Sequence, residues 1–236
     1  MDRVEYLDIT SDISNSEGGS LFSLENTLLL PVPLPAPQSS ARLPHPIPYQ
    51  GSKRQLAASI LAVLGSRKFQ TLYEPFAGSA AVTIAATQVK VARDYVLGDN
   101  LAALIDLWNQ ILSSPYTLAN EYERLWNGQA QGDEAYYNEV RREFNRSHEP
   151  AALLYLLARC VKNALRFNQQ GEFNQSHDKR RLGTHPHKMR REILETWSLL
   201  SKHTTAVCAD CEVSLAEATS EDIVYMDPPL LKPTIM

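Results

Sequence analysis

Short apolar runs in this chain of 236 residues alternate with longer segments whose apolar residues recur at helical spacing. The short runs predict strands at 69–74, 94–100, 204–207 and 223–226. The longer segments predict helices at 56–64, 78–87, 101–112, 118–126, 134–144, 150–163 and 185–200. Residues 214–218 are predicted to form a polar connection or a short helix. Strands that alternate with helices in this way predict an α/β fold with an open sheet.

The first 45 residues lack this pattern. Residues 1–26 are acidic and contain few apolar residues, and proline recurs from Pro31 to Pro48. Such a composition is typical of an extended or disordered tail, so residues 1–45 are predicted to lie outside the folded domain. The sequence contains no run of 18 apolar residues and no signal-peptide pattern, so no membrane segment is predicted.

The clearest chemical signal is a strand–turn–helix unit at 71–86. Its strand ends at Glu74, and the small residues of 76–80 predict a tight turn before an alanine-rich helix. Such a unit places a carboxylate and several free backbone N–H groups where open α/β sheets bind ligands. Small residues let a cofactor approach the main chain. The alternative interpretation is an ordinary tight turn.

A second signal lies far downstream, where the predicted strand 223–226 ends in Asp227-Pro228-Pro229. Each proline fixes its own φ and restricts the residue before it, so Asp227 is expected to hold one extended conformation. The Asp227 carboxylate and the Pro228 carbonyl form a pair of acceptors. Such a pair suits an exocyclic amine, for example N6 of adenine.

Two more positions suggest ligand contacts. Asp99 ends the second predicted strand, 20–25 residues after the glycine turn, where an acid commonly holds a ribose diol; a helix N-cap is the alternative. Lys53 follows a glycine loop at the start of a predicted helix, which is an unfavourable place for a cation. A specific partner for Lys53 is therefore expected, and a plain surface lysine is the alternative.

The charge of the chain is unevenly distributed. The net charge is −4, yet residues 141–191 contain twelve Lys/Arg and four Asp/Glu, a local charge of +8. A basic segment of this kind is typical of phosphate binding, although a solvated helical face is the alternative. The three cysteines give no disulfide framework, and the C-x-x-C spacing of Cys208 and Cys211 has no second pair to complete a zinc site. A reducing cytoplasm is expected.

Five short motifs occur in a family order: 49–53 (YQGSK), 74–81 (EPFAGSAA), 98–100 (GDN), 171–174 (GEFN) and 227–229 (DPP). Together they resemble Dam-like DNA adenine-N6 methyltransferases over about residues 46–229. The resemblance implies S-adenosyl-L-methionine as methyl donor, double-stranded DNA as substrate, and a Rossmann-like sheet with a mostly helical DNA-recognition insertion. It assigns 46–112 and 204–236 to the catalytic domain and 113–203 to the insertion.

The resemblance also implies roles for single residues. The expected catalytic residues are Asp227, Pro228 and Pro229. The expected cofactor-binding residues are Tyr49, Lys53, Glu74, Phe76, Gly78, Asp99 and Asp227. The expected DNA-binding residues are Arg166, Asn168, Asn174, Lys179, Arg180 and Arg181, and no metal is expected.

Two features depart from the family pattern. Leu230 stands where the family has an aromatic residue, most often Tyr, whose stacking on a flipped-out base contributes about 1–3 kcal/mol. The sequence also supplies about four strands of a seven-stranded sheet. The catalytic domain is therefore expected to be incomplete at the C-terminus, as a truncated product, with Asp227 at an exposed edge. A monomer is expected, and a separate chain that supplies the missing part is the alternative.

Three functions stay open at this point. The chain is an active DNA adenine-N6 methyltransferase, or a non-catalytic remnant that binds DNA or cofactor weakly, or a methyltransferase for another amine such as RNA adenine or glutamine. Loss of core favours the remnant for the isolated chain. The 171–174 motif argues against the third function.

Overall fold

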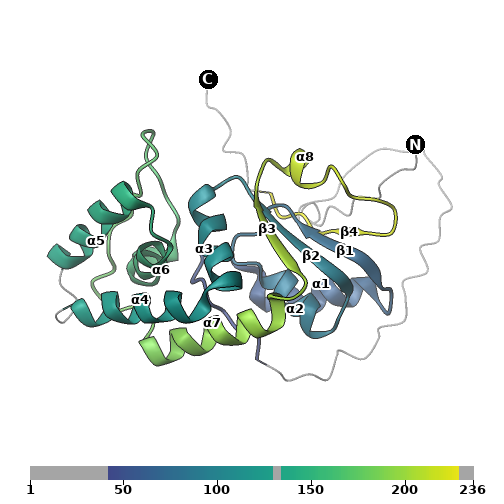
Figure 1. Ribbon diagram of the computed structural model, residues 1–236, viewed down its shortest axis with the longest axis horizontal. Coiled ribbons are helices and arrows are strands. Elements are labelled where there is room, and N and C mark those ends of the chain that lie inside the picture. Colours follow the sequence, from purple (N-terminus) through teal and green to yellow (C-terminus); the bar gives the residue numbers. More distant parts are fainter. Residues whose placement is uncertain (1–41, 130–133, 229–236) are drawn as a thin grey trace, which may run out of the picture.

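The structure, a computed structural model, describes residues 42–129 and 134–228. Its strands form one parallel sheet in the order β3-β2-β1-β4. They are β1 (Phe69–Glu74), β2 (Ala92–Asp99), β3 (Thr204–Cys208) and β4 (Ile223–Val224). The predicted α/β fold is confirmed, and β4, the last strand along the described chain, lies beside β1 at one edge of the sheet (Figure 1).

The described helices agree with the sequence pattern. They are α1 (Ala57–Leu64), α2 (Ala81–Gln88), α3 (Ala102–Ser113), α4 (Pro115–Gly128), α5 (Glu134–Ser147), α6 (Pro150–Arg159), α7 (Pro186–Leu200) and α8 (Cys211–Ser214), with single 3-10 turns η1 (Lys53–Gln55) and η2 (Val161–Asn163). No helix in the described part of the chain has the length and apolar content that crossing a membrane requires.

Four helix boundaries differ from the prediction by three or more residues: α4 begins at Pro115 and α5 ends at Ser147, so both are longer than predicted, whereas α6 and α2 are shorter. The helix predicted over 150–163 ends at Arg159, because Cys160 has extended backbone, and Lys162 and Asn163, with φ values of 60° and 52°, keep the helix from resuming. The Asn163 side chain then donates to Leu157 O (2.7 Å) and satisfies a carbonyl at the helix end. The helix predicted from residue 78 begins at Ala81, because Gly78 and Ala80 both have φ near 47°.

One face of the sheet is covered and the other is largely open. Leu72 pairs in register with Tyr95, and Leu97 pairs with Ala206, so these four side chains share a face, where they pack on α1, α2 and α3. On the opposite face Val96 and Val207 are only partly buried. Figure 1 is viewed from this open face, with α1 and α2 behind the strands.

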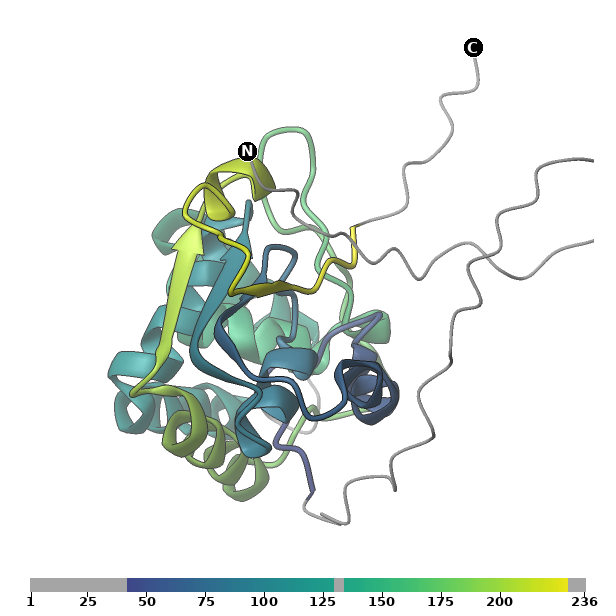
Figure 2. The ribbon, with the colours of Figure 1, turned by 90° about the vertical axis from the view of Figure 1, so that its right-hand side faces the viewer.

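The helices between β2 and β3 share one continuous core with the turn that follows β1. Every residue of α6 from Ala151 to Arg159 is buried, as expected for a helix that is surrounded on all sides. The same cluster includes Ala77 and Ala80 of the turn and Trp108 of α3. Packing of the helical part therefore supports the turn directly. Viewed from the β4 side, the yellow segment of β4 lies above the purple segment that begins at residue 42 (Figure 2).

Candidate active site

Glu74, at the carboxyl end of β1, is buried and fixes the start of α2. Its Oε2 atom accepts hydrogen bonds from the backbone N of Thr83 (3.0 Å) and from Thr83 Oγ1 (2.6 Å). Burial raises the pKa of Glu74 to about 7; the Thr83 hydrogen bonds oppose this shift, and the charge of Asp227 adds to it. Glu74 thus supplies a carboxyl group to the site while it holds the helix N-terminus.

The turn between β1 and α2 is tied to the end of β2. The N–H groups of Ala77, Gly78 and Ala80 donate to Gly98 O (2.8 Å), Asp99 Oδ2 (3.3 Å) and Ala77 O (2.6 Å). The expectation of several free N–H groups is wrong for these three, because two of them bind β2 and one binds within the turn. These three N–H groups are therefore not available to a ligand.

Gly78 is required by space as well as by its φ. A Cβ atom at this position would lie 3.2 Å from Cε1 of Tyr49, which is tighter than ordinary contact. Trp108 Nε1 donates to Gly78 O (3.0 Å), so Gly78 lies between the rings of Trp108 and Tyr49. The absence of a side chain keeps the Tyr49 ring against the turn.

Asp99 is not the helix N-cap of the alternative interpretation, because Leu101 holds that position in α3; Asp99 instead braces the chain before the helix and lines the cavity. Its Oδ1 accepts from Leu101 N (3.1 Å) at the start of α3, and its Oδ2 accepts from Gly78 N. Burial raises the pKa of Asp99, and these backbone hydrogen bonds oppose the shift. The carboxylate is thus fixed in place at the end of β2, beside the turn.

The loop at 49–53 is tied to both halves of the molecule. Ser79 Oγ donates to Ser52 Oγ (2.9 Å), and Gln50 N donates to Asn163 O (3.0 Å). Lys53 Nζ forms an ion pair with Asp227 Oδ2, so the specific partner expected for Lys53 is Asp227. The loop therefore closes over the strand ends and joins the first motif to the last.

Asp227 follows β4 directly beside the end of β1. Tyr73 is in register with Val224, and Tyr225 N donates to Tyr73 O (2.8 Å). Burial raises the pKa of Tyr225 to about 12, and the neighbouring charges of Asp227 and Glu74 add to this shift. The two acidic strand ends are therefore neighbours, as the sequence predicted, and in the described part of the chain Asp227 belongs to an edge strand.

A single cavity of about 690 Å³ brings the predicted catalytic and cofactor residues together. They are Tyr49, Lys53, Glu74, Phe76, Gly78, Asp99, Asp227 and Pro228. Pro229 lies outside the described residues. Sequence reasoning missed Leu165, which enters the same cavity from the helical part, and Ser52 and Ser79, whose mutual hydrogen bond forms part of the wall.

The predicted DNA-binding residues lie outside this cavity, on a hairpin-like loop and the segment after it. Phe167 and Phe173 form an antiparallel bridge in that loop, as the sequence suggested. Asn168 holds its turn: its Oδ1 accepts from Gln170 N and Glu172 N, and its Nδ2 donates to Glu172 Oε2 (2.9 Å). The side chains of Arg166 and Asn174 belong to exposed residues. The side-chain amide of Asn168 is therefore engaged within the loop, whereas the side chains of Arg166 and Asn174 are accessible to a ligand.

Asp178 organises the basic segment after the loop. Its carboxylate accepts from Arg180 Nε and Nη2 (both 3.0 Å) and from Arg181 Nε (3.1 Å), and the Arg180 hydrogen bond is the main cause that lowers the pKa of Asp178. Lys179 is exposed, with its Nζ 3.8 Å from Glu134. Asp178 thus neutralises part of the basic segment and fixes the direction of both arginines.

The buried Glu74 leads to a prediction about stability and pH. The pKa of Glu74 is about 7 in the folded chain and has its ordinary value of 4.5 in the unfolded chain. Between pH 4.5 and 7 the carboxyl group is therefore protonated in the folded state and ionised in the unfolded state. The free energy of unfolding should therefore fall as pH rises from about 4.5 to 7, by on the order of 3 kcal/mol. Urea unfolding between pH 4.5 and 8 measures this trend.

Glu74→Gln should remove this part of the pH dependence. Both Thr83 donors bind the same oxygen of Glu74, and the glutamine carbonyl can replace it. The exposed Glu217→Gln is the matched control and should keep the wild-type trend. Equal slopes for wild type and Glu74→Gln would contradict the assignment.

Comparison with known proteins agrees with this geometry. Residues 49–232 match the family model described as D12 class N6 adenine-specific DNA methyltransferase. The chain is 31% identical over 164 residues to the retron Ec67 DNA adenine methylase of Escherichia coli, covering 67% of this chain and 54% of that protein. It is 28% identical over 162 residues to the DNA adenine methylase of Serratia marcescens, covering 67% and 57%.

A phage protein is also similar. The DNA N-6-adenine-methyltransferase of Escherichia phage P1 is 29% identical over 166 residues, which cover 67% of this chain and 20% of that protein. The chain spans about half the length of the first two relatives. The family match covers most of the chain and includes every cavity residue that carries chemistry. The chain therefore belongs to the D12 class of N6 adenine-specific DNA methyltransferases.

Proposed function

We propose that this chain transfers a methyl group from S-adenosyl-L-methionine to N6 of adenine in double-stranded DNA. The observation that carries the proposal is the shared cavity in which Asp227 and Pro228 face the Glu74–Gly78 turn. The retron and bacterial relatives named above are DNA adenine methylases, which supports the same assignment.

The described residues fit the cofactor. A cavity of about 690 Å³ lies within the range of small-molecule sites. Its charged lining consists of Lys53 and three acids, a balance that suits a positively charged ligand, and the absence of a side chain at Gly78 lets the Tyr49 ring lie against the turn. We assign the ribose diol to Asp99 and apolar contact to Tyr49 and Phe76. When bound, S-adenosyl-L-methionine supplies an electrophilic methyl group on a sulfonium.

In this proposal the protein acts on the target amine mainly by orienting it. The Asp227 carboxylate and the Pro228 carbonyl accept hydrogen bonds from the two N–H groups of the amine. The lone pair of the amine nitrogen is thereby directed toward the methyl group. Alignment of the reacting atoms supplies much of the rate. Lys53 holds Asp227 Oδ2, which fixes the carboxylate and leaves Oδ1 for the amine. Phe76 and Leu165 contribute apolar wall that excludes water.

The target adenine must leave the duplex, because its N6 is otherwise paired and stacked. We assign duplex binding to residues 113–203, with Arg166, Asn174, Lys179, Arg180 and Arg181 as contacts and Asn168 as the residue that shapes the loop. Residues 46–112 and 204–236 form the catalytic part. We place the enzyme in the cytoplasm as a monomer.

Methyl transfer by the purified 236-residue chain tests the function. The chain is incubated with S-adenosyl-L-methionine carrying a labelled methyl group and with duplex DNA that lacks adenine methylation. We expect label in N6-methyladenine after digestion of the DNA, and none in an RNA duplex of the same sequence. Absence of label in adenine, or label in cytosine, would contradict the proposal.

A further inference from the structure

A second cavity lies on the other side of the 49–52 loop from the candidate active site. It has a volume of about 650 Å³ and adjoins a smaller one of about 540 Å³; both are lined by His45, Tyr49 and Arg54. Tyr49 also lines the candidate active site, so one aromatic side chain borders both spaces. We call the combined space, whose basic lining includes Arg54, Arg181 and Lys188, the basic cleft.

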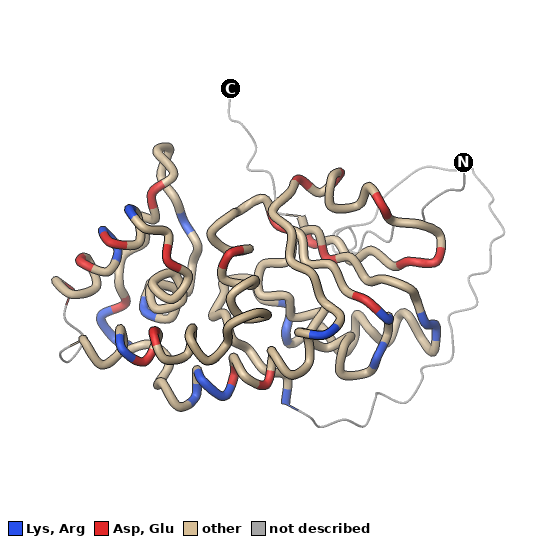
Figure 3. The backbone as a smooth tube through the Cα atoms, in the orientation of Figure 1, with Lys and Arg blue, Asp and Glu red and all other residues tan. Residues whose placement is uncertain are grey.

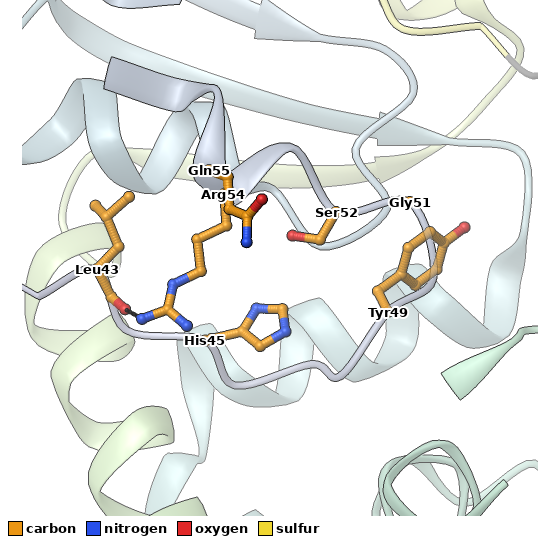
Figure 4. Close-up of a pocket in the computed structure, with 7 residues that line it drawn as sticks. All are labelled: Leu43, His45, Tyr49, Gly51, Ser52, Arg54 and Gln55. Carbon is orange, nitrogen blue, oxygen red and sulfur yellow. Dashed lines mark hydrogen bonds between the residues drawn. The ribbon is translucent and has the colours of Figure 1, made fainter. Parts of the chain in front are cut away.

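Apart from Arg42, the cations of the basic cleft come from three separate segments. Arg54 belongs to η1, Arg181 follows the hairpin-like loop, and Lys188 lies on α7 together with Arg191. Arg42 and Arg191 are paired with Glu192 and Glu195. Figure 4 shows the Arg54 and His45 side chains pointing into the space below the loop, with the Ser52 and Tyr49 side chains beside it. A fold that gathers cations from three segments around one cavity presents a site for a negative charge.

The acid that faces the basic cleft is already neutralised. The buried carboxylate of Glu192 forms an ion pair with Arg42 and accepts from His45 N (2.8 Å). By contrast, within the described residues no ion pair is found for Arg54 or Lys188, and the Arg54 side chain donates to Leu43 O (2.8 Å). Positive charge therefore remains unbalanced in the cleft.

The same charges act on His45. Burial lowers the pKa of His45, and the positive charge of Arg54 lowers it further; Glu192 opposes the shift and Lys188 adds to it. The ring therefore stands in an environment that disfavours another positive charge. An anion in the cleft would relieve that repulsion.

The acidic side of the molecule indicates which way DNA approaches. Residues 209–228 contain six Asp/Glu and no Lys or Arg. Figure 3 shows only red segments around α8 and the chain after it, whereas blue segments recur along α7. A polyanion is repelled from the α8 side and attracted to the side that carries the basic cleft.

We propose that the basic cleft binds a backbone phosphate of DNA through Arg54 and Lys188, on the opposite side of Tyr49 from the candidate active site. This inference rests on the proposed function, which supplies DNA as the ligand, and adds two contacts outside the hairpin-like loop. Arg181 closes the cleft while Asp178 holds it, so Arg54 and Lys188 are the cations that remain for the phosphate. Phosphate contacts of this kind set the position of a duplex without reading its sequence.

The test is the salt dependence of duplex binding by the full chain. Fluorescence anisotropy with a labelled duplex is measured from low to high NaCl for wild type and for the double variant Arg54→Gln/Lys188→Gln. Losing one phosphate contact should reduce the slope of log K against log [salt] by about 0.9. The affinity should fall roughly tenfold at one fixed salt concentration.

The matched control is Arg67→Gln/Lys202→Gln, which removes one arginine and one lysine from exposed positions away from the cleft. It has the same net charge as the test variant and should keep the wild-type slope. Thermal unfolding of both variants shows whether they fold. A slope that falls equally in both would mean a general charge effect and would overturn the inference.

Two further outcomes separate this inference from the proposed function. If wild type binds the duplex and the cleft variant keeps its slope, the inference fails and the proposed function stands. If wild type binds no duplex, both fail. Calorimetry with inorganic phosphate is the second arm: tight binding of free phosphate, together with an unchanged duplex slope in the cleft variant, would overturn the assignment to DNA.

Discussion

Asp227→Asn should slow methyl transfer by on the order of 10²–10³-fold, the loss typical for one aligned polar group at a reacting centre. The amide keeps the size of the side chain, but it loses the charge that pairs with Lys53 and replaces one acceptor oxygen with a donor. An NH₂ group aimed at the target amine or at Lys53 repels either one. Single-turnover incorporation of labelled methyl into duplex DNA gives the rate.

Cofactor affinity separates this effect from damage to the cavity. The dissociation constant of S-adenosyl-L-methionine should change much less than the rate, because the turn, Asp99 and Tyr49 are untouched. Glu217→Gln, an exposed acid upstream on the same side of the sheet, should retain wild-type activity. An Asp227→Asn enzyme with more than a tenth of wild-type rate would contradict the role given to this carboxylate.

Trp108→Ala should cost about 3–5 kcal/mol of stability, as expected for removal of a fully buried indole. Trp108→Phe separates the contribution of the buried volume from that of the hydrogen bond. Phenylalanine keeps most of the volume but leaves Gly78 O without its donor, which should cost about 1–3 kcal/mol of stability. Urea unfolding measures both changes.

Cofactor affinity should also depend on the contact of Trp108 with Gly78. Trp108→Phe loosens the peptide that lies between the indole and the Tyr49 ring, so its affinity for S-adenosyl-L-methionine should fall more than its stability alone explains. Trp197→Phe is the control, because Trp197 packs edge-on against Tyr116 and does not line the candidate active site. Equal cofactor affinity in wild type and Trp108→Phe would contradict this dependence.

Local sequence pattern was enough to predict the end of β1 and the turn, whereas β4 was predicted to reach Met226 and ends at Val224. Glu74 closes an apolar run and is followed by small residues, and Asp227 closes another, so both positions follow from a chain that must bury strands in a parallel sheet. Their contact follows from topology: two carboxyl ends of neighbouring parallel strands meet at one edge. The positions of Glu74 and Asp227 could thus be predicted without knowing which side chains they contact.

Ion pairs between residues far apart in the chain could not be predicted from the sequence pattern. Lys53 and Asp227 are 174 positions apart, and only the fold brings them together. The sequence predicted a specific partner for Lys53 without identifying it. Similarly, Asn168 was predicted to bind DNA, whereas its side-chain amide forms hydrogen bonds within the hairpin-like loop. Such competition between local bonds and ligand contacts becomes visible only when the loop geometry is known.

The end of α6 shows a different limit. Apolar spacing continues past Arg159, so periodicity favours a longer helix, but Cys160 is extended and the left-handed residues Lys162 and Asn163 then turn the chain. Asn tolerates this conformation better than most residues, and its side chain caps the helix. A lysine at positive φ carries no comparable signal in the sequence.

The short pairing of β4 has a consequence for motion. Only Ile223 and Val224 are paired with β1 as strand residues, so the segment that carries Asp227 has few backbone bonds to break before it detaches. Local opening of this kind occurs more readily than opening of a long central strand. The amide protons of 223–225 should therefore exchange with solvent far sooner than those of β1, and ligands that engage Asp227 should slow that exchange.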